Sequence, residues 1–147
     1  MRILEIELMF QNEETLNKVL EECKEDFELV DEWSRNLKAN IAGNPEEALR
    51  GLTELSGAFS GLRTVLGIAV AEKRNREGRE YNRIRIETEN AEKKFVSAVT
   101  EQQASTHVAN YRRIRNIVEA YTESCKQMIV SLQSNLKYQK EESKNPE

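Results

Sequence analysis

The sequence predicts an all-α fold: a long antiparallel helical hairpin with an additional N-terminal helix, forming a single helical domain over residues 1–140. Apolar residues recur at steps of three and four along most of the 147 residues, and there are only two prolines. The chain is 38% hydrophobic and 33% charged, which is typical of amphipathic helices that complete their burial against partner chains. We therefore expect a homo-oligomer.

The first helix is expected over residues 12–42. Asn12 is a suitable N-cap, and the acidic residues after it favour the positive end of a helix. An apolar stripe then runs to Ile41, and Gly43 suits the residue that follows a helix C-terminus. Residues 3–10 alternate loosely, which leaves a short strand and a one-turn helix both open.

The second helix is expected over residues 45–87, because an Asn-Pro pair precedes two acids and an apolar stripe. The large apolar residues of this stripe run from Leu49 through Phe59 to Ile86. Glycines interrupt the stripe, each at a cost of about 1 kcal/mol relative to alanine. They indicate either a close approach by another helix or a bend, and Gly78 is a candidate kink. The interrupting glycines are Gly51, Gly57, Gly61 and Gly67.

The third helix is expected over residues 91–140, after a turn at residues 87–90. Its apolar stripe runs from Val99 to Leu136, and from Ala104 onward its steps alternate between three and four. This periodicity predicts a coiled-coil-like seam. The polar tail, residues 141–147, is expected to fray.

Charge is distributed unevenly around the net value of −4. Residues 1–59 carry six Lys/Arg and fourteen Asp/Glu, whereas residues 60–140 carry fifteen and nine. This asymmetry indicates either an anion-binding second half or subunits that pack acidic half against basic half.

Two cysteines far apart, Cys23 and Cys125, fit a reducing compartment and lie on apolar stripes as small hydrophobes. No apolar run is long enough for a membrane span or a leader. We expect a soluble cytoplasmic protein without a membrane partner. Trp33 and Phe27 are interpreted as core residues.

No catalytic, metal or cofactor pattern stands out. His107 is the single histidine, with no nucleophile or acid arranged around it in sequence, so a structural role is the better interpretation. The glycines lie inside a helical pattern rather than in a phosphate-binding loop, and the acids suit solvated helix faces. We therefore expect a protein that is not an enzyme and needs no cofactor.

The most informative segment is Lys73–Arg85, with six Lys/Arg and two Glu. One interpretation is a solvated helical face, in which neighbouring glutamates pair with these cations. The other is a phosphate-binding surface, since Arg outnumbers Lys and suits forked phosphate contacts; Tyr81 would stack on a base. The candidate nucleic-acid-binding residues are Lys73, Arg74, Arg76, Arg79, Tyr81, Arg83, Arg85, Lys93, Lys94, Arg112, Arg113 and Arg115, with Arg63 as a possible addition.

Four segments, 58–73, 81–87, 111–121 and 129–137, follow one another in an order that resembles small all-helical bacteriophage proteins similar to the phage recombination mediator. In that family a basic helix leads to a turn, and a last helix ends in a Ser-Leu-Gln-like segment before a lysine. The resemblance implies single-stranded DNA binding by a ring-like homo-oligomer that helps load a recombinase while displacing the single-strand-binding protein. By position, the DNA contacts would come from Lys73, Arg74, Arg76, Arg83 and Arg85.

Two hypotheses follow. The first is sequence-independent binding of single-stranded DNA, accessory to phage recombination or replication. The second is a helical protein–protein adaptor or inhibitor whose acidic N-terminal half binds a basic host protein.

Overall fold

The computed structural model describes residues 3–38 and 44–144. Within these ranges the protein has six α-helices, one 3-10 turn and no β-strand, which confirms the all-α class. The helices are α1 (Ile3–Phe10), α2 (Lys18–Glu22), α3 (Lys24–Lys38), α4 (Pro45–Asn90), α5 (Ser97–His107) and α6 (Ala109–Lys144), and the 3-10 turn η1 spans Glu13–Thr15.

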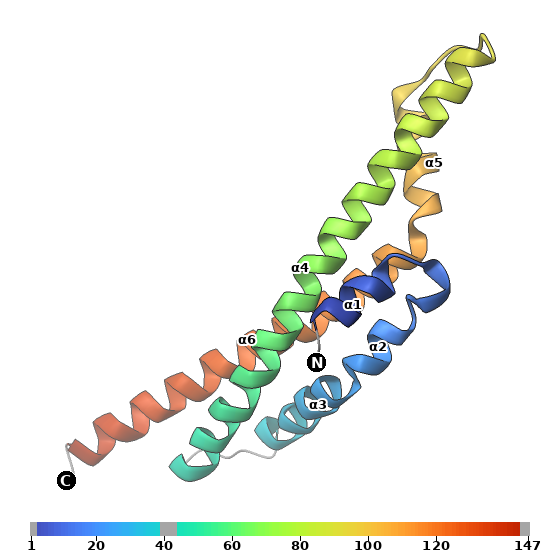
Figure 1. The fold of residues 1–147 in the computed structure, drawn as a ribbon. Coiled ribbons are helices and arrows are strands. Elements are labelled where there is room, and N and C mark those ends of the chain that lie inside the picture. The colour runs from blue at the N-terminus through green and yellow to red at the C-terminus, as the bar shows by residue number, and fades with distance from the viewer. Residues whose placement is uncertain (1–2, 39–43, 145–147) are drawn as a thin grey trace.

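Helix α4 determines the shape of the molecule. It has 46 residues and is therefore about 69 Å long. The chain turns at its upper end, and α5 and then α6 return along it, while α1, α2 and α3 lie beside its lower half (Figure 1). We call residues 73–107, which include the last turns of α4 and all of α5, the arm, and the remainder the body.

The prediction of one helix over residues 12–42 is wrong. The segment forms η1, α2 and α3, with interruptions at residues 16–17 and at Cys23. Asn12 caps η1 rather than a long helix, because its side chain accepts a hydrogen bond from the amide of Glu14 at 3.0 Å. The Thr15 hydroxyl donates to the carbonyl of Met9 at 2.8 Å, which fastens the turn to α1. Residues 39–43 lie outside the described residues, and residues 3–10 adopt the helical alternative.

The single helix expected over residues 91–140 is also wrong. Helix α4 continues to Asn90, so the turn begins three residues later than expected, and Glu92 has a positive φ of 55°. The returning chain breaks again at Val108. There, the guanidinium group of Arg112 donates to both the carbonyl and the hydroxyl of Ser105. That carbonyl would bond to residue 109 in a continuous helix, so the side chain competes with the helical ladder.

Two smaller expectations also change. Helix α4 passes through Gly78 without interruption, so this glycine does not break the helix. Helix α6 continues through residues 141–144, which were expected to fray; residues 145–147 lie outside the described part of the chain.

The core lies in the body, where α4 packs mainly against α6. The large residues chosen for the α4 stripe are partly misplaced, because Leu49 is 56% and Ile86 50% exposed. Small residues face the core instead, among them Ala48, Gly51 and Ala58. A Cβ on Gly51 would lie 2.8 Å from the Trp33 ring, so side chains, rather than the backbone of another helix, pack closely against this glycine.

The aromatic and cysteine predictions are confirmed, with Phe27 packing at the edge of the core. Trp33 is fully buried and its Nε1 donates to Glu54 at 2.7 Å. Phe27 is half-buried and its ring stacks on Tyr121 at 4.1 Å. Burial raises the pKa of the Cys23 thiol to about 12 and that of Cys125 to about 11.

The stripe expected on the last helix is largely buried, from Ala104 in the arm to Leu132 in the body. Val99 is the exception, being 50% exposed, while the neighbouring Thr100 is buried. No helix in the described ranges is both long and apolar enough to cross a membrane.

Candidate nucleic-acid interface

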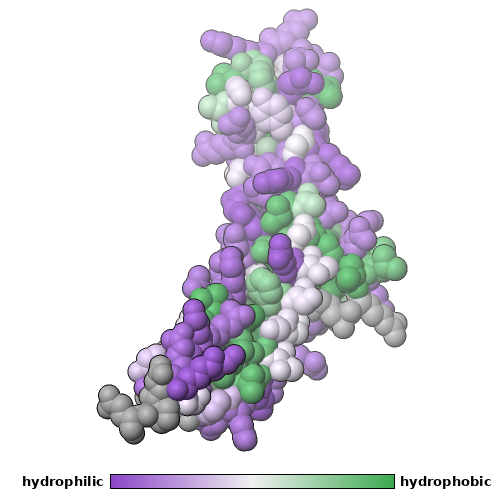
Figure 2. Space-filling model, turned by 90° about the vertical axis from the view of Figure 1, so that its left-hand side faces the viewer, coloured by the Kyte–Doolittle hydropathy of each residue, from purple (hydrophilic) through white to green (hydrophobic). Residues whose placement is uncertain are grey.

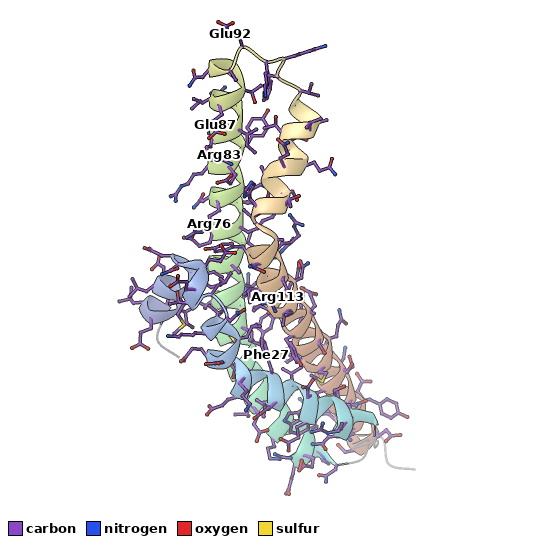
Figure 3. The ribbon with its side chains drawn as sticks, turned by 90° about the vertical axis from the view of Figure 1, so that its right-hand side faces the viewer. Phe27, Arg76, Arg83, Glu87, Glu92 and Arg113 are labelled. Atoms are coloured by element: carbon purple, nitrogen blue, oxygen red, sulfur yellow. The ribbon has the colours of Figure 1, made fainter. Side chains whose placement is uncertain are left out.

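The candidate cations divide between the two parts of the molecule. Those of Lys73–Arg85 lie on the upper half of α4, and Lys93 and Lys94 follow at the tip, whereas Arg112, Arg113 and Arg115 lie on α6 in the body. Figure 3 shows Arg76 and Arg83 along α4, with Arg113 well below them. The structure therefore does not gather all of these side chains on one surface.

Glutamates one helical turn away hold several of the arm's cations. Lys73 Nζ lies 2.8 Å from Glu77, and Arg83 bridges Glu80 at 2.9 Å and Glu87 at 2.8 Å. Hydrogen bonds from Arg83 lower the pKa of the Glu80 carboxyl. For Lys73 and Arg83 the ion-paired helical face is the confirmed interpretation.

Arg76 has a structural role at the junction of arm and body. Its Nη2 donates to the carbonyls of Phe10 at 3.1 Å and Gln11 at 2.6 Å. These groups follow the C-terminal end of α1, where carbonyls lack helical partners. The guanidinium carbon also lies 4.4 Å from the centre of the Tyr111 ring. Arg76 thereby joins α1, α4 and α6.

The arginines on α6 already have partners within the described part of the chain. Arg112 bonds to Ser105 of α5, Arg113 donates to the side-chain oxygen of Asn17 at 2.7 Å, and Arg115 pairs with Glu119 at 3.7 Å. These contacts would have to be exchanged before the three side chains could join the α4 arginines in one phosphate-binding surface.

Tyr81 does not present a free ring face as an isolated stacking platform would. Its ring meets Phe95 edge-on, with centres 5.9 Å apart, and its hydroxyl lies 3.3 Å from that of Ser97. The pair instead joins α4 to the start of α5.

Five cations of the arm remain exposed, and none of them forms an ion pair or hydrogen bond within residues 3–38 and 44–144. They are Arg74, Arg79, Arg85, Lys93 and Lys94. Arg74 and Arg85 are eleven residues apart, as are Arg63 and Arg74, and eleven residues make about three helical turns. These three arginines therefore share the outer face of α4, with about 16 Å between neighbouring Cα atoms.

The same outer face contains two exposed glycines, Gly67 and Gly78. A Cβ built at either position would meet nothing within 4 Å. In contrast to Gly51, packing within the chain does not require them, and they leave the helix backbone accessible. Figure 2 shows mostly hydrophilic side chains over the arm, with hydrophobic ones near its upper end.

The structure also brings together residues that the sequence could not associate. A pocket at the junction places Glu13 of η1 and Tyr111 of α6 beside Arg79, and His107, which is 56% exposed at its side chain, lies 3.9 Å from Glu80. Because these residues come from distant parts of the chain, no spacing pattern signals the group.

No group of three or more potential metal ligands occurs in the described ranges. Comparison of the chain with protein-family models, curated protein sequences and solved structures finds no match. Fold and site together define an all-helical protein with a packed body and a projecting arm that carries unpaired cations.

Proposed function

We propose that the arm binds single-stranded DNA through its phosphate backbone, independently of sequence. The observation that carries the proposal is the set of exposed, unpaired cations on one projecting element: Arg74, Arg79, Arg85, Lys93 and Lys94. A cation that already pairs with a glutamate contributes less binding free energy when it contacts a phosphate, because the existing ion pair must be broken first. Those without partners can neutralise phosphates and release counterions.

The arrangement suits contacts with the phosphate backbone of a nucleic acid rather than contacts that recognise its bases. Arginines on one face of a straight helix form a row, and phosphates present a row of acceptors. Tyr81 and Phe95 contact each other, so base stacking is a minor part of the proposal. In this proposal the protein is a binding protein rather than an enzyme.

The choice of a single strand, and of an accessory role in phage recombination or replication, rests on the resemblance to phage recombination mediators. A homo-oligomer with a recombinase or single-strand-binding protein as partner belongs to the same proposal. Light scattering with and without an oligonucleotide measures the assembly; a monomer in both conditions would contradict the oligomeric part alone.

The test of DNA binding is fluorescence polarisation with a labelled oligonucleotide over a salt series. The variant combines Arg74→Gln with Arg85→Gln, and its matched control combines Lys126→Gln with Lys137→Gln. Both remove two exposed positive charges, but the control charges lie on α6 outside the arm. We expect only the arm variant to reduce the slope of log K against log salt, by about 1.4, since each single-strand phosphate contact contributes about 0.7.

Absence of binding at low salt would rule out the arm as the interface, and so would an equal reduction of the salt slope in both double variants. An unlabelled duplex that competes as well as the single strand would remove the strand preference and leave phosphate binding intact. Arg76 and Arg83 are excluded from the design, because their partners would lose contacts as well.

A second function is favoured by a different observation on α1. Ile3, Leu4 and Leu8 are 53%, 74% and 65% exposed, in the acidic part of the chain. Such apolar residues beside acidic ones suit a protein partner with a basic rim, which corresponds to the adaptor hypothesis. A stoichiometric partner captured from nuclease-treated host lysate, and lost in a Leu4→Glu, Leu8→Glu variant, would favour it over DNA binding.

A further inference from the structure

A pocket of about 220 Å³ lies where the arm meets the body. Arg76, Arg79 and Glu80 line it from α4, Glu13 from η1, and His107 and Tyr111 from the two sides of the break between α5 and α6. A water molecule occupies about 30 Å³ in the liquid. The pocket therefore has room for a small polyatomic ligand together with water.

Within the described ranges, two buried donor atoms on residues that line this pocket lack a hydrogen-bond partner. Tyr111 is 3% exposed, and its hydroxyl is buried without a hydrogen-bond partner. The Nε of Arg76 is also buried without one, since the nearest carboxylate oxygen, on Glu72, lies 3.6 Å away, beyond hydrogen-bond distance. Arg79 adds an exposed guanidinium group with no partner in the described ranges. Buried polar groups are rarely left in this state.

One oxygen of each carboxylate in the pocket is already occupied. Glu80 Oε2 accepts two hydrogen bonds from Arg83, at 3.1 and 2.9 Å. Glu13 Oε1 accepts from the side-chain amide of Asn110 at 2.7 Å. The two arginines of the lining match its two glutamates in charge, but Glu80 is paired with Arg83 from outside the pocket, which leaves Arg79 as an exposed guanidinium beside unpaired donors. What fits this imbalance is a ligand that is negatively charged and rich in acceptor oxygens.

We propose that this pocket is an oxyanion site that binds a phosphate group between Arg79 and the Tyr111 hydroxyl, with Arg76 Nε as a further donor. The proposal does not depend on DNA binding by the outer face of α4. Arg76 already holds the carbonyls of Phe10 and Gln11 and contacts the Tyr111 ring, so two of the donors are held in place before the ligand arrives.

The test is isothermal titration calorimetry with inorganic phosphate, in chloride buffer of matched ionic strength. We expect saturable binding that Arg79→Gln weakens about tenfold or more and Tyr111→Phe about fivefold, since each removes a hydrogen bond to a charged ligand. Tyr111→Phe keeps the ring against Arg76, and circular dichroism with thermal unfolding verifies its fold. The matched control is Arg35→Gln, which removes the same charge from an exposed position on α3, outside both the pocket and the arm, and should leave the affinity within about twofold.

Three outcomes would overturn the proposal. The first is no saturable heat with phosphate. The second is full phosphate affinity in Tyr111→Phe, because the ligand would then not reach the buried hydroxyl. The third is a loss of phosphate affinity in Arg35→Gln equal to that in Arg79→Gln, which would indicate general charge attraction.

A second arm of the experiment distinguishes the source of the phosphate group. A labelled oligonucleotide without terminal phosphates is titrated with wild-type protein and with Tyr111→Phe, which preserves every charge. If a backbone phosphate occupies the pocket, the variant weakens oligonucleotide and phosphate alike. If the pocket takes free phosphate or a phosphate monoester, Tyr111→Phe leaves oligonucleotide affinity unchanged while phosphate affinity falls. The phosphate titration stands by itself if the arm fails to bind DNA.

Discussion

The two halves of α4 differ in what they contact. In the body, α4 buries seven residues between Ala48 and Ala69 against α3 and α6. In the arm, no described residue of α4 is buried, and α5 contributes only Thr100 and Ala104. One continuous helix therefore serves as core in its first half and as a carrier of charge in its second. Burial and exposed charge therefore lie at different ends of the same element.

The arm is held by weaker interactions than the body. Its ion pairs at one-turn spacing, such as Lys73–Glu77 and Arg83–Glu87, lie at the surface, where solvent screening leaves each of them a small contribution to stability. The edge contact of Tyr81 with Phe95 is its main aromatic packing. Charged side chains can remain exposed on the arm because its folding does not require their burial.

The largest expected effect tests whether stability resides in the body. Leu62 is fully buried, whereas Ile86 in the arm is 50% exposed. We expect Leu62→Ala to lower the free energy of unfolding by about 2–5 kcal/mol and Ile86→Ala by less than about 1 kcal/mol. Urea denaturation followed by circular dichroism measures both. Similar losses at the two positions would contradict the division into body and arm.

An intermediate effect is expected at the junction. Arg76→Ala removes hydrogen bonds to the carbonyls of Phe10 and Gln11, so we expect a loss of about 1–3 kcal/mol and faster amide exchange in α1. Its matched control is Arg74→Ala, which removes an exposed arginine from the same helix and should stay within about 0.5 kcal/mol. If exchange in α1 is unchanged, Arg76 does not fasten that helix.

The smallest effect concerns an acid in the body. Burial, and secondarily the charge of Glu25, raise the pKa of Asp26 above its usual 3.8. The folded protein therefore holds this proton more tightly than the unfolded chain does. The ionised carboxylate lowers the free energy of unfolding above the folded pKa, and this penalty is absent below pH 3.8. Asp26→Asn should therefore stabilise at pH 7 by less than about 1 kcal/mol, since the site is partly exposed.

Thermal unfolding of wild type and Asp26→Asn from pH 7 down to pH 4 tests this sign. The advantage of the variant should shrink as the pH falls, because the wild-type carboxyl then takes up its proton. A constant difference across this range would assign the effect to packing rather than to ionisation.

Much of the core was predictable from periodicity. The stripe on the last helix, from Ala104 to Leu132, is buried as expected, because a regular spacing of three and four places side chains on one side. The buried positions of α4 were harder to predict. Leu49 is large and exposed while Ala48 and Gly51 face the core, since close helix packing selects small residues that hydrophobicity alone does not indicate.

The site was predictable only as a segment. Composition identified Lys73–Arg85, but could not say that Arg83 is held by two glutamates while Arg85, two residues away, has no partner among the described residues. Nor could it indicate that Arg112 bonds to Ser105 and Arg113 to Asn17. The contact of Arg112 accompanies the break at Val108, which no spacing pattern indicated.

By itself, the sequence determined that the chain is helical, that its thiols are buried and that its cations concentrate in one segment. Those properties follow from residue type and from spacing along a single helix. The tertiary structure alone decided where the helices break, which arginines stay unpaired, and that Tyr111, Arg76 and Arg79 surround one pocket. The pocket joins Tyr111 to arginines more than thirty positions earlier, and this contact depends on how the helices pack rather than on any local preference.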